Sequence, residues 1–210
     1  MADELSVETV RANLARIREE VSDTVEILAA VKYVPVDQLG VLSDAGITLV
    51  GENRAQELAS KVTANPGMFT WDFIGHLQSR KVKDVLPHVR YLHSVASDSV
   101  LAQLGRHAPE GTEVLVEVNI AGEPDKSGIA PAELTAFIAR CPVTVVGLMT
   151  MPPLAEHPEQ SRPYFAALRE LAERHGLRHL SMGTSQDFRV AVQEGATIVR
   201  LGTILYRPSA

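Results

Sequence analysis

The first residue whose position suggests chemistry is Lys32, which directly follows the apolar run 27–31. Five apolar residues in a row, with Pro35 shortly after them, favour a short strand that is buried on both faces. A lysine at the end of such a strand can extend its ammonium group into water. It can also form a Schiff base with a carbonyl, because partial burial favours the neutral, nucleophilic amine. This segment alone does not choose between the two interpretations.

Two later loops combine glycine with small hydroxyl residues in the manner of a phosphate site. Residues 181–187, Ser-Met-Gly-Thr-Ser-Gln-Asp, follow one predicted strand and precede a predicted helix. Backbone N–H groups and the positive helix end would hold a phosphate dianion there, with Ser185 as a contact. Gly202 and Thr203, after the next strand, add an N–H group and a hydroxyl. The alternative is that Ser185 or Asp187 only caps a helix.

A lysine and a phosphate site at the same rim predict a phosphorylated aldehyde held as a Schiff base. Pyridoxal 5'-phosphate (PLP) has both groups. Arg200 stands two residues before Gly202, where we expect it to meet the ring nitrogen of the cofactor. Because arginine is effectively always charged, it would keep that nitrogen unprotonated and make the cofactor a weak electron sink.

Eight predicted strands, alternating with helices, must position these residues. The strands lie near residues 27, 47, 71, 90, 114, 143, 179 and 197, and a helical segment follows each of the first seven. Regular alternation implies parallel strands with right-handed crossovers. The sequence therefore predicts the α/β class and a single (β/α)8 TIM barrel, with an extra N-terminal helix over residues 5–20. An open, doubly wound sheet is the alternative.

In a barrel, the residues just after each strand share one rim, which is the catalytic face. This rule adds Asn53 and Met149 to the expected cofactor site with Lys32. We also expect His76 and His93 at the rim, as hydrogen-bonding residues. Neither histidine has a predicted carboxylate partner, so we expect no metal site.

The composition is that of an ordinary globular protein, with 45% hydrophobic and 22% charged residues among 210. A net charge of −6 gives no reason to expect a nucleic acid or an anionic membrane as a partner. No apolar run approaches the ~20 residues of a membrane helix, and no signal-peptide core follows Met1. The single cysteine, Cys141, excludes a disulfide framework. We expect a cytoplasmic protein with one domain over residues 1–210, whose leading helical segment, 1–24, packs on the barrel.

Seven short motifs occur in order between residues 27 and 206: 30–35, 51–53, 73–78, 119–128, 147–149, 182–187 and 200–203. In them the chain resembles the pyridoxal phosphate homeostasis protein family, whose barrel is similar to the N-terminal domain of alanine racemase. The resemblance implies Lys32 as the Schiff-base lysine and Arg200 as the partner of the ring nitrogen. It implies Asn53 and Met149 near the cofactor, and phosphate contacts from Ser185, Gly202 and Thr203. The sequence departs from the family pattern at Val31, at Arg80 and at Tyr206 with Arg207.

Two functions from different classes stay open. The resemblance implies a PLP-binding protein that serves intracellular PLP homeostasis and delivers the cofactor to apo PLP-dependent enzymes, without substantial catalytic turnover. The alternative is a PLP-dependent amino-acid racemase, which needs an acid–base group on each face of the ring. In alanine racemase a separate β-domain supplies the second group. This sequence has no segment for such a domain between the last predicted strand and Ala210. This favours the carrier and a monomer.

Tyr33, next to the lysine, is a candidate for the second acid–base group, although we expect its ring to be buried and to serve packing. A sugar-phosphate isomerase or aldolase is a third hypothesis, and it would require an acid such as Glu52 near Lys32. The basic segment 80–83 reads as a solvated helix face, with a docking or cofactor-entry patch as its alternative.

Overall fold

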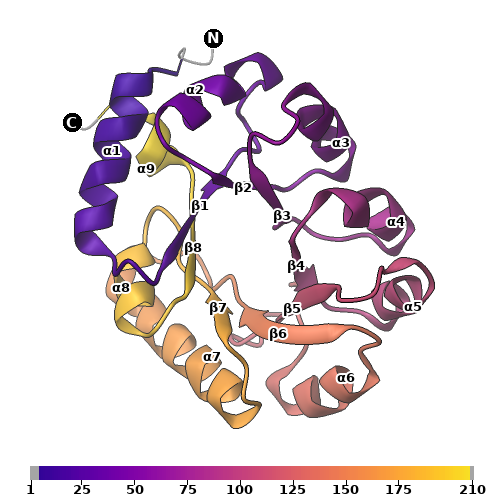
Figure 1. Cartoon of the computed structure of the whole chain (residues 1–210). Coiled ribbons are helices and arrows are strands. Elements are labelled where there is room, and N and C mark those ends of the chain that lie inside the picture. Colours follow the sequence, from indigo (N-terminus) through magenta and orange to yellow (C-terminus); the bar gives the residue numbers. More distant parts are fainter. Residues whose placement is uncertain (1–4, 209–210) are drawn as a thin grey trace.

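The computed structural model describes residues 5–208 and shows a closed barrel of eight parallel strands, ordered β1 to β8 around the ring (Figure 1). Pairing of β1 with β8, with Glu26 opposite Ile198, closes the barrel. The predicted (β/α)8 barrel is confirmed, and the open sheet is wrong. The strands are β1 (Glu26–Ala30), β2 (Leu49–Glu52), β3 (Thr70–Phe73), β4 (Tyr91–Val95), β5 (Glu113–Glu117), β6 (Thr144–Met149), β7 (His179–Ser181) and β8 (Ile198–Leu201).

Helices surround the barrel and connect its strands (Figure 1). In the described residues, those that follow β1 to β8 in turn are α2 (Leu39–Asp44), α3 (Ala55–Ala64), α4 (Val82–Val85), α5 (Asp98–His107), α6 (Leu134–Arg140), α7 (Arg162–Arg174), α8 (Phe188–Gln193) and α9 (Thr203–Tyr206). Short 3-10 helices cover Val36–Gln38, Ser79–Lys81, Leu86–His88, Pro131–Glu133 and Pro158–Ser161. The basic segment 80–83, expected as one helix face, is thus divided between a 3-10 helix and the short α4. α9 was not predicted, because four residues are too few to show a helical period.

The leading helix, α1 (Val7–Glu20), lies outside the barrel beside α9 and α2 (Figure 1). The Ser6 hydroxyl caps its first turn. The amide of Asn13 donates to the carbonyl oxygens of Leu205 and Arg207, at 3.1 and 2.8 Å. These bonds tie α1 to the segment that follows β8. Residues 1–4 of the predicted leading segment, and 209–210 of the predicted domain, lie outside the described residues.

The interior of the barrel has an apolar layer and a polar layer. The apolar layer is a buried cluster that consists of Leu28, Leu49, Tyr91, Leu115, Val146 and Ile198. Side chains two residues apart on a strand point to the same face, so the next inward residues include His93, Glu117 and Arg200. This second layer is buried and lies closer to the carboxyl ends of the strands. The barrel therefore presents polar groups towards the rim at which the sequence predicts the site.

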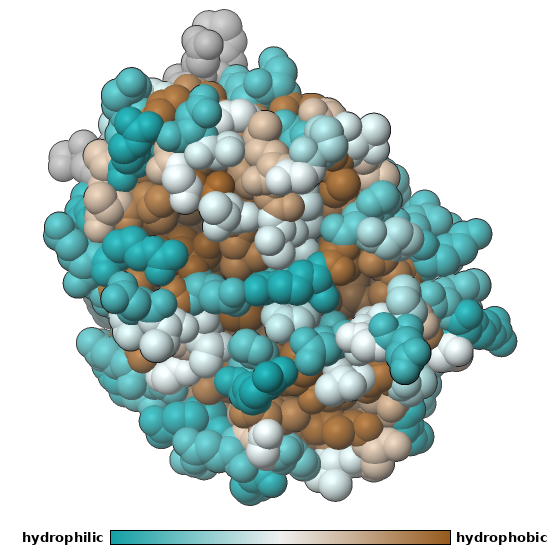
Figure 2. All heavy atoms as spheres, in the orientation of Figure 1, coloured by the Kyte–Doolittle hydropathy of each residue, from teal (hydrophilic) through white to brown (hydrophobic). Residues whose placement is uncertain are grey.

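The surface seen in the orientation of Figure 1 is largely hydrophilic, with hydrophobic residues in smaller patches between the charged ones (Figure 2). Within residues 5–208, no helix has both the length and the hydrophobicity needed to cross a membrane. The same residues contain no group of three or more His, Cys, Asp or Glu side chains arranged to hold a metal ion.

Candidate functional site

A cavity of about 660 Å³ at the carboxyl ends of β1, β2, β7 and β8 gathers most of the residues that the sequence predicts. Six of the seven predicted cofactor-binding residues line it: Lys32, Asn53, Ser185, Arg200, Gly202 and Thr203. The seventh, Met149, is buried at the end of β6 and does not line this cavity. Met151, two residues later, contacts the site instead, because its sulfur lies 2.8 Å from the Arg200 guanidinium.

Lys32 enters the cavity from the turn that follows β1. The N–H of Val31 donates to the carbonyl of Gly51 at 2.9 Å, so the backbone is held up to the residue before Lys32. The Lys32 ammonium lies 4.8 Å from the centroid of the Tyr33 ring. Hydrogen bonding to Lys32, together with its positive charge, lowers the pKa of the Tyr33 hydroxyl. Tyr33 is 77% exposed, so the prediction that its ring is buried is wrong.

The buried ion pair of Lys61 and Glu52 supports the turn that contains Lys32. Lys61, on α3, donates from Nζ to the carbonyl oxygen of Val31 at 2.7 Å and to Glu52 Oε2 at 2.5 Å. The other oxygen of Glu52 accepts the backbone N–H groups of Asn53 and Arg54, at 2.7 and 2.9 Å. Glu52 is therefore engaged with Lys61 and with its own loop, which removes the acid that the sugar-phosphate hypothesis requires. Lys61 was not predicted as a site residue, because its only signal in the sequence is its place on the apolar face of a helix.

Arg200 is a buried cation whose hydrogen bonds go to uncharged acceptors. Its guanidinium donates to the carbonyl and hydroxyl oxygens of Ser181, at 2.6 Å each, and to the Thr150 carbonyl at 2.9 Å. Burial lowers the pKa of Arg200 to about 10. A cation in this position attracts a ligand atom that can accept a hydrogen bond, because such a contact offsets the loss of hydration.

The loop after β7 and the start of α9 lie together at the cavity and form a candidate anion site. The Ser185 hydroxyl oxygen accepts the N–H groups of Gly202 and Ile204, at 3.2 and 3.5 Å. Two backbone donors, on the residues before and after Thr203, therefore converge on one oxygen, which is the kind of arrangement that binds a phosphate oxygen. Asp187 accepts from the N–H and hydroxyl of Thr184, at 2.7 and 3.0 Å, and makes no side-chain cap bond to α8. Neither Ser185 nor Asp187 caps α8 with its side chain, whereas the Ser185 hydroxyl caps the first turn of α9 by accepting the N–H of Ile204, so the helix-cap alternative stays open for Ser185.

Two glycines lie in these segments, Gly183 in the loop after β7 and Gly202 between β8 and α9. Gly183 has a φ of +90°, and a Cβ atom there would lie 2.6 Å from the Cβ of Ala191. Its carbonyl accepts the N–H of Arg200 at 2.9 Å, which joins the loop to β8. Gly202 is different, because a Cβ at that position would meet only Ala30, at 3.8 Å and beyond. The absence of a side chain at Gly202 leaves open space in the cavity wall.

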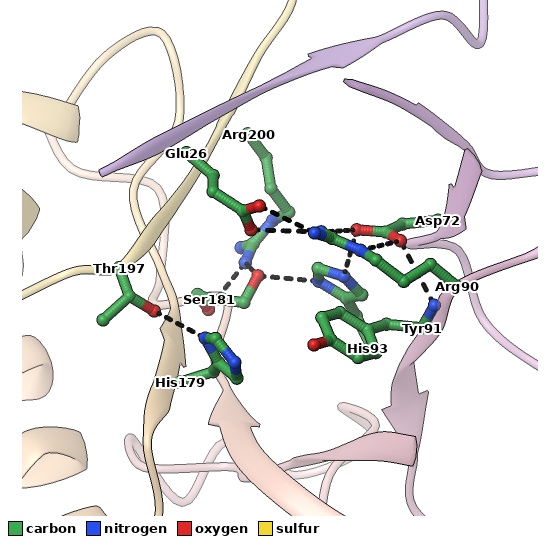
Figure 3. A network of polar contacts seen from close by, with 9 residues as sticks. All are labelled: Glu26, Asp72, Arg90, Tyr91, His93, His179, Ser181, Thr197 and Arg200. Carbon is green, nitrogen blue, oxygen red and sulfur yellow. Dashed lines mark hydrogen bonds and ion pairs between the residues drawn. The ribbon is translucent and has the colours of Figure 1, made fainter. Parts of the chain in front are cut away.

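The histidines are not both at the rim. His76 is exposed, whereas His93 is fully buried inside the barrel on β4, so its predicted place is wrong. The physical reason is that β4 continues to Val95 and directs His93 inward. Its Nε2 atom lies 3.1 Å from Asp72 Oδ2, a carboxylate partner that the sequence analysis did not find (Figure 3).

Tyr206 is a further cavity residue that the sequence analysis did not assign to the site. Its hydroxyl donates to the carbonyl of Ala30, the last residue of β1, at 3.0 Å. Burial raises the pKa of this hydroxyl well above its ordinary value. The sequence did contain a signal for this assignment, because Tyr206 lies about one helical turn after Gly202 and so can face the same side of a helix. The hydroxyl keeps the start of the Lys32 turn in contact with α9.

Comparison with known proteins identifies the family to which the chain belongs. The family model of the alanine racemase N-terminal domain matches residues 5–210. A pyridoxal phosphate homeostasis protein of Aquifex aeolicus is 41% identical over 195 residues, which cover 86% of each chain. The chain belongs to the pyridoxal phosphate homeostasis protein family. A relative of the same name in Pseudomonas aeruginosa is 37% identical over 216 residues, or 95% of this chain and 94% of the other.

Solved structures agree with this assignment. PipY of Synechococcus elongatus with PLP bound has a TM-score of 0.83 and 32% identity, and the match covers 94% of this chain and all of PipY. Alanine racemase of Clostridium difficile has a TM-score of 0.73 at 15% identity, with 58% of its length covered. That second likeness is one of fold alone. The resemblance drawn from the seven motifs is confirmed, and the relatives are named as homeostasis proteins.

Proposed function

We propose that the protein binds PLP as a Schiff base on Lys32, holds it and delivers it to apo PLP-dependent enzymes, without substantial catalytic turnover. The observation that supports this most is one cavity that contains an amine, a buried guanidinium and a pair of convergent backbone donors. PLP has an aldehyde, a pyridine nitrogen and a phosphate, which correspond to these three groups. The PLP-bound structure of PipY supports the same ligand.

Each proposed role follows from the residue's surroundings. Lys32 provides the amine, and the turn held by the Val31 backbone limits its movement. Gly202 and Thr203, with Ser185, bind the phosphate. Arg200 donates to the ring nitrogen, and Asn53 lies at the cavity wall near Lys32. When bound, the cofactor supplies an aldehyde and an electron-withdrawing ring.

The carrier function is preferred to the racemase because of how Arg200 is placed. A guanidinium on the ring nitrogen donates a hydrogen bond and does not release a proton, so the ring withdraws electrons less strongly. Racemisation also needs two acid–base groups, one on each face of the cofactor. His93 is buried in the barrel and His76 does not line the cavity. Tyr33, which lies beside Lys32, is the residue that the racemase hypothesis would use.

A spectroscopic titration tests the proposal. Addition of PLP to the purified protein should produce the visible absorbance of a lysine Schiff base, and Lys32→Ala should abolish it with the fold retained. Lys83→Ala, at an exposed lysine of α4, is the matched control and should behave as the unaltered protein. The loaded protein should reactivate an apo PLP-dependent enzyme but should not racemise L-alanine. Sustained racemisation would contradict the carrier function, and a titration without visible absorbance would contradict both.

A further inference from the structure

A continuous hydrogen-bond network passes through the barrel interior and ends at Arg200, which lines the cavity (Figure 3). It consists of Arg90, Asp72, His93, Ser181 and Arg200, and we call it the interior network. Asp72, His93, Ser181 and Arg200 are at most 6% exposed, and each comes from a different strand. The Ser181 hydroxyl is 2.6 Å from Arg200 and 2.8 Å from His93 Nδ1, and His93 Nε2 is 3.1 Å from Asp72.

The charged end of the network lies at Arg90. The guanidinium of Arg90 donates to both oxygens of Asp72, at 3.1 and 2.7 Å, and to both oxygens of Glu26, at 2.7 and 3.1 Å. Burial alone would raise the pKa of Asp72, but hydrogen bonds from His93 and Arg90 outweigh it and hold that pKa below its ordinary value. Asp72 is therefore an acceptor only.

The donors and acceptors then fix every hydrogen in the network. Burial lowers the pKa of His93, and the charge of Arg200 acts in the same direction, so the imidazole is neutral near pH 7. Because Asp72 only accepts, the single ring hydrogen of His93 belongs on Nε2. His93 Nδ1 then accepts the hydroxyl hydrogen of Ser181. The Ser181 oxygen has its lone pairs left for Arg200, which can only donate.

The network therefore has a direction that ends at Arg200. One terminal nitrogen of the guanidinium is held by both oxygens of Ser181, and the other by the Thr150 carbonyl and the Met151 sulfur. A carboxylate in direct contact could have held Arg200 more simply, but it would have neutralised the charge. Here the carboxylate of Asp72 is paired with Arg90, and His93 and Ser181 stand between it and Arg200. They transmit orientation while the positive charge stays available to a ligand.

We infer that Ser181, His93 and Asp72 are positioning residues that orient Arg200 towards the ring nitrogen of the bound cofactor. The inference rests on the proposed function, since it gives Arg200 a PLP ring to face. None of the three residues lines the cavity. They act through Arg200, and their removal should alter the environment of the ring nitrogen while the phosphate and lysine contacts remain.

The test uses PLP labelled with ¹⁵N in the ring, bound to the full-length protein, with the ring-nitrogen chemical shift and the visible absorption maximum as readouts. Ser181→Ala and His93→Gln should still acquire visible absorbance with PLP. Both should move the ¹⁵N shift towards the value of Arg200→Gln and release PLP roughly tenfold faster, as loss of supporting partners behind a bound group commonly does. Ser94→Ala, a buried serine on β4 that donates to the Gly75 carbonyl, is the matched control and should keep the ¹⁵N shift of the unaltered protein.

A double-mutant cycle separates positioning from stability. In the Arg200→Gln background, Ser181→Ala should not change the ¹⁵N shift further. An unchanged ¹⁵N shift in Ser181→Ala and His93→Gln, or an equal displacement by Ser181→Ala in both backgrounds, would overturn the inference. If Ser181→Ala does not fold, Ser181→Cys provides the same comparison with a weaker donor. Absence of visible absorbance in the unaltered protein would instead contradict the proposed function itself.

Discussion

Lys61 Nζ lies 2.5 Å from Glu52 Oε2, in a pair whose side chains are 2% and 0% exposed. The same ammonium holds the carbonyl of Val31, and Glu52 holds the N–H groups of Asn53 and Arg54. One buried ion pair thus connects Val31, the residue before Lys32, to Glu52, the residue before Asn53. The ion pair therefore holds the segments of Lys32 and Asn53, which both line the cavity, and it also contributes to the stability of the protein.

Removal of one member of this pair should destabilise the protein strongly. Lys61→Met leaves the Glu52 carboxylate buried without its counter-charge, which typically costs about 3–5 kcal/mol of unfolding free energy. Urea unfolding measures the loss. Lys61→Met with Glu52→Gln should be less destabilised than Lys61→Met alone, because the glutamine oxygen can still accept the loop N–H groups. Equal losses in the single and double variants would show that the buried charge is not the cause.

Loss of the Ser185 hydroxyl should weaken phosphate recognition selectively. Ser185→Ala removes one hydrogen-bonding group from the anion site, and we expect the PLP dissociation constant to rise roughly tenfold. Pyridoxal has the same aldehyde and ring without the phosphate, so its affinity should stay unchanged. Absorbance titrations with both ligands measure the difference. A parallel loss of pyridoxal affinity would place Ser185 at the ring and not at the phosphate.

Gly183 should not tolerate a side chain. Gly183→Ala combines a φ of +90° with a Cβ only 2.6 Å from Ala191, so both strain and a clash should displace the phosphate loop. We expect a stability loss of about 1–3 kcal/mol with weaker PLP binding. Gly111→Ala isolates the backbone effect, since φ is +80° there and nothing lies within 4 Å of the added Cβ. If both variants bind PLP equally well, close packing at Gly183 does not shape the site.

His93 should make the protein less stable as the pH falls. Its pKa in the folded state is below the ordinary value of 6.5 because it is buried, so the unfolded chain takes up the proton first. Stability is therefore complete above about pH 6.5 and decreases below it, by at most about 1.4 kcal/mol per pH unit for one proton. Unfolding free energies between pH 7 and 5 should fall less steeply in His93→Gln. Parallel curves for the two proteins would contradict a neutral, buried His93.

The sequence predicts strand-end residues well and interior residues poorly. Lys32, Gly202 and Thr203 were found because a parallel barrel brings every strand end to one rim, whatever the details of packing. The prediction for His93 was wrong because it depended on the residue at which β4 ends. The strand continues for two residues beyond His93, to Val95, and this places the imidazole in the interior and not at the rim. Asp72 was missed for a related reason, since a charged residue within a short strand reads as exposed until its partner on another strand is known.

Tyr33 and Lys61 show a second limit. An aromatic residue beside a buried strand is expected to bury its ring, yet Tyr33 lies at the exposed edge of the cavity next to Lys32. A lysine on a helix is expected to be solvated, yet Lys61 is buried because Glu52 and a backbone carbonyl together accept its hydrogens. Both outcomes depend on contacts between segments that are distant in sequence, which no local pattern reports.

The most direct measurement of the central claim is the identity of the lysine that carries PLP. Borohydride reduces a Schiff base to a stable amine, so the reduced protein can be digested and the modified peptide identified by mass spectrometry. We expect a single phosphopyridoxyl group on Lys32, absent from Lys32→Ala treated in the same way. Modification of another lysine, such as Lys126, with Lys32 unmodified would contradict it.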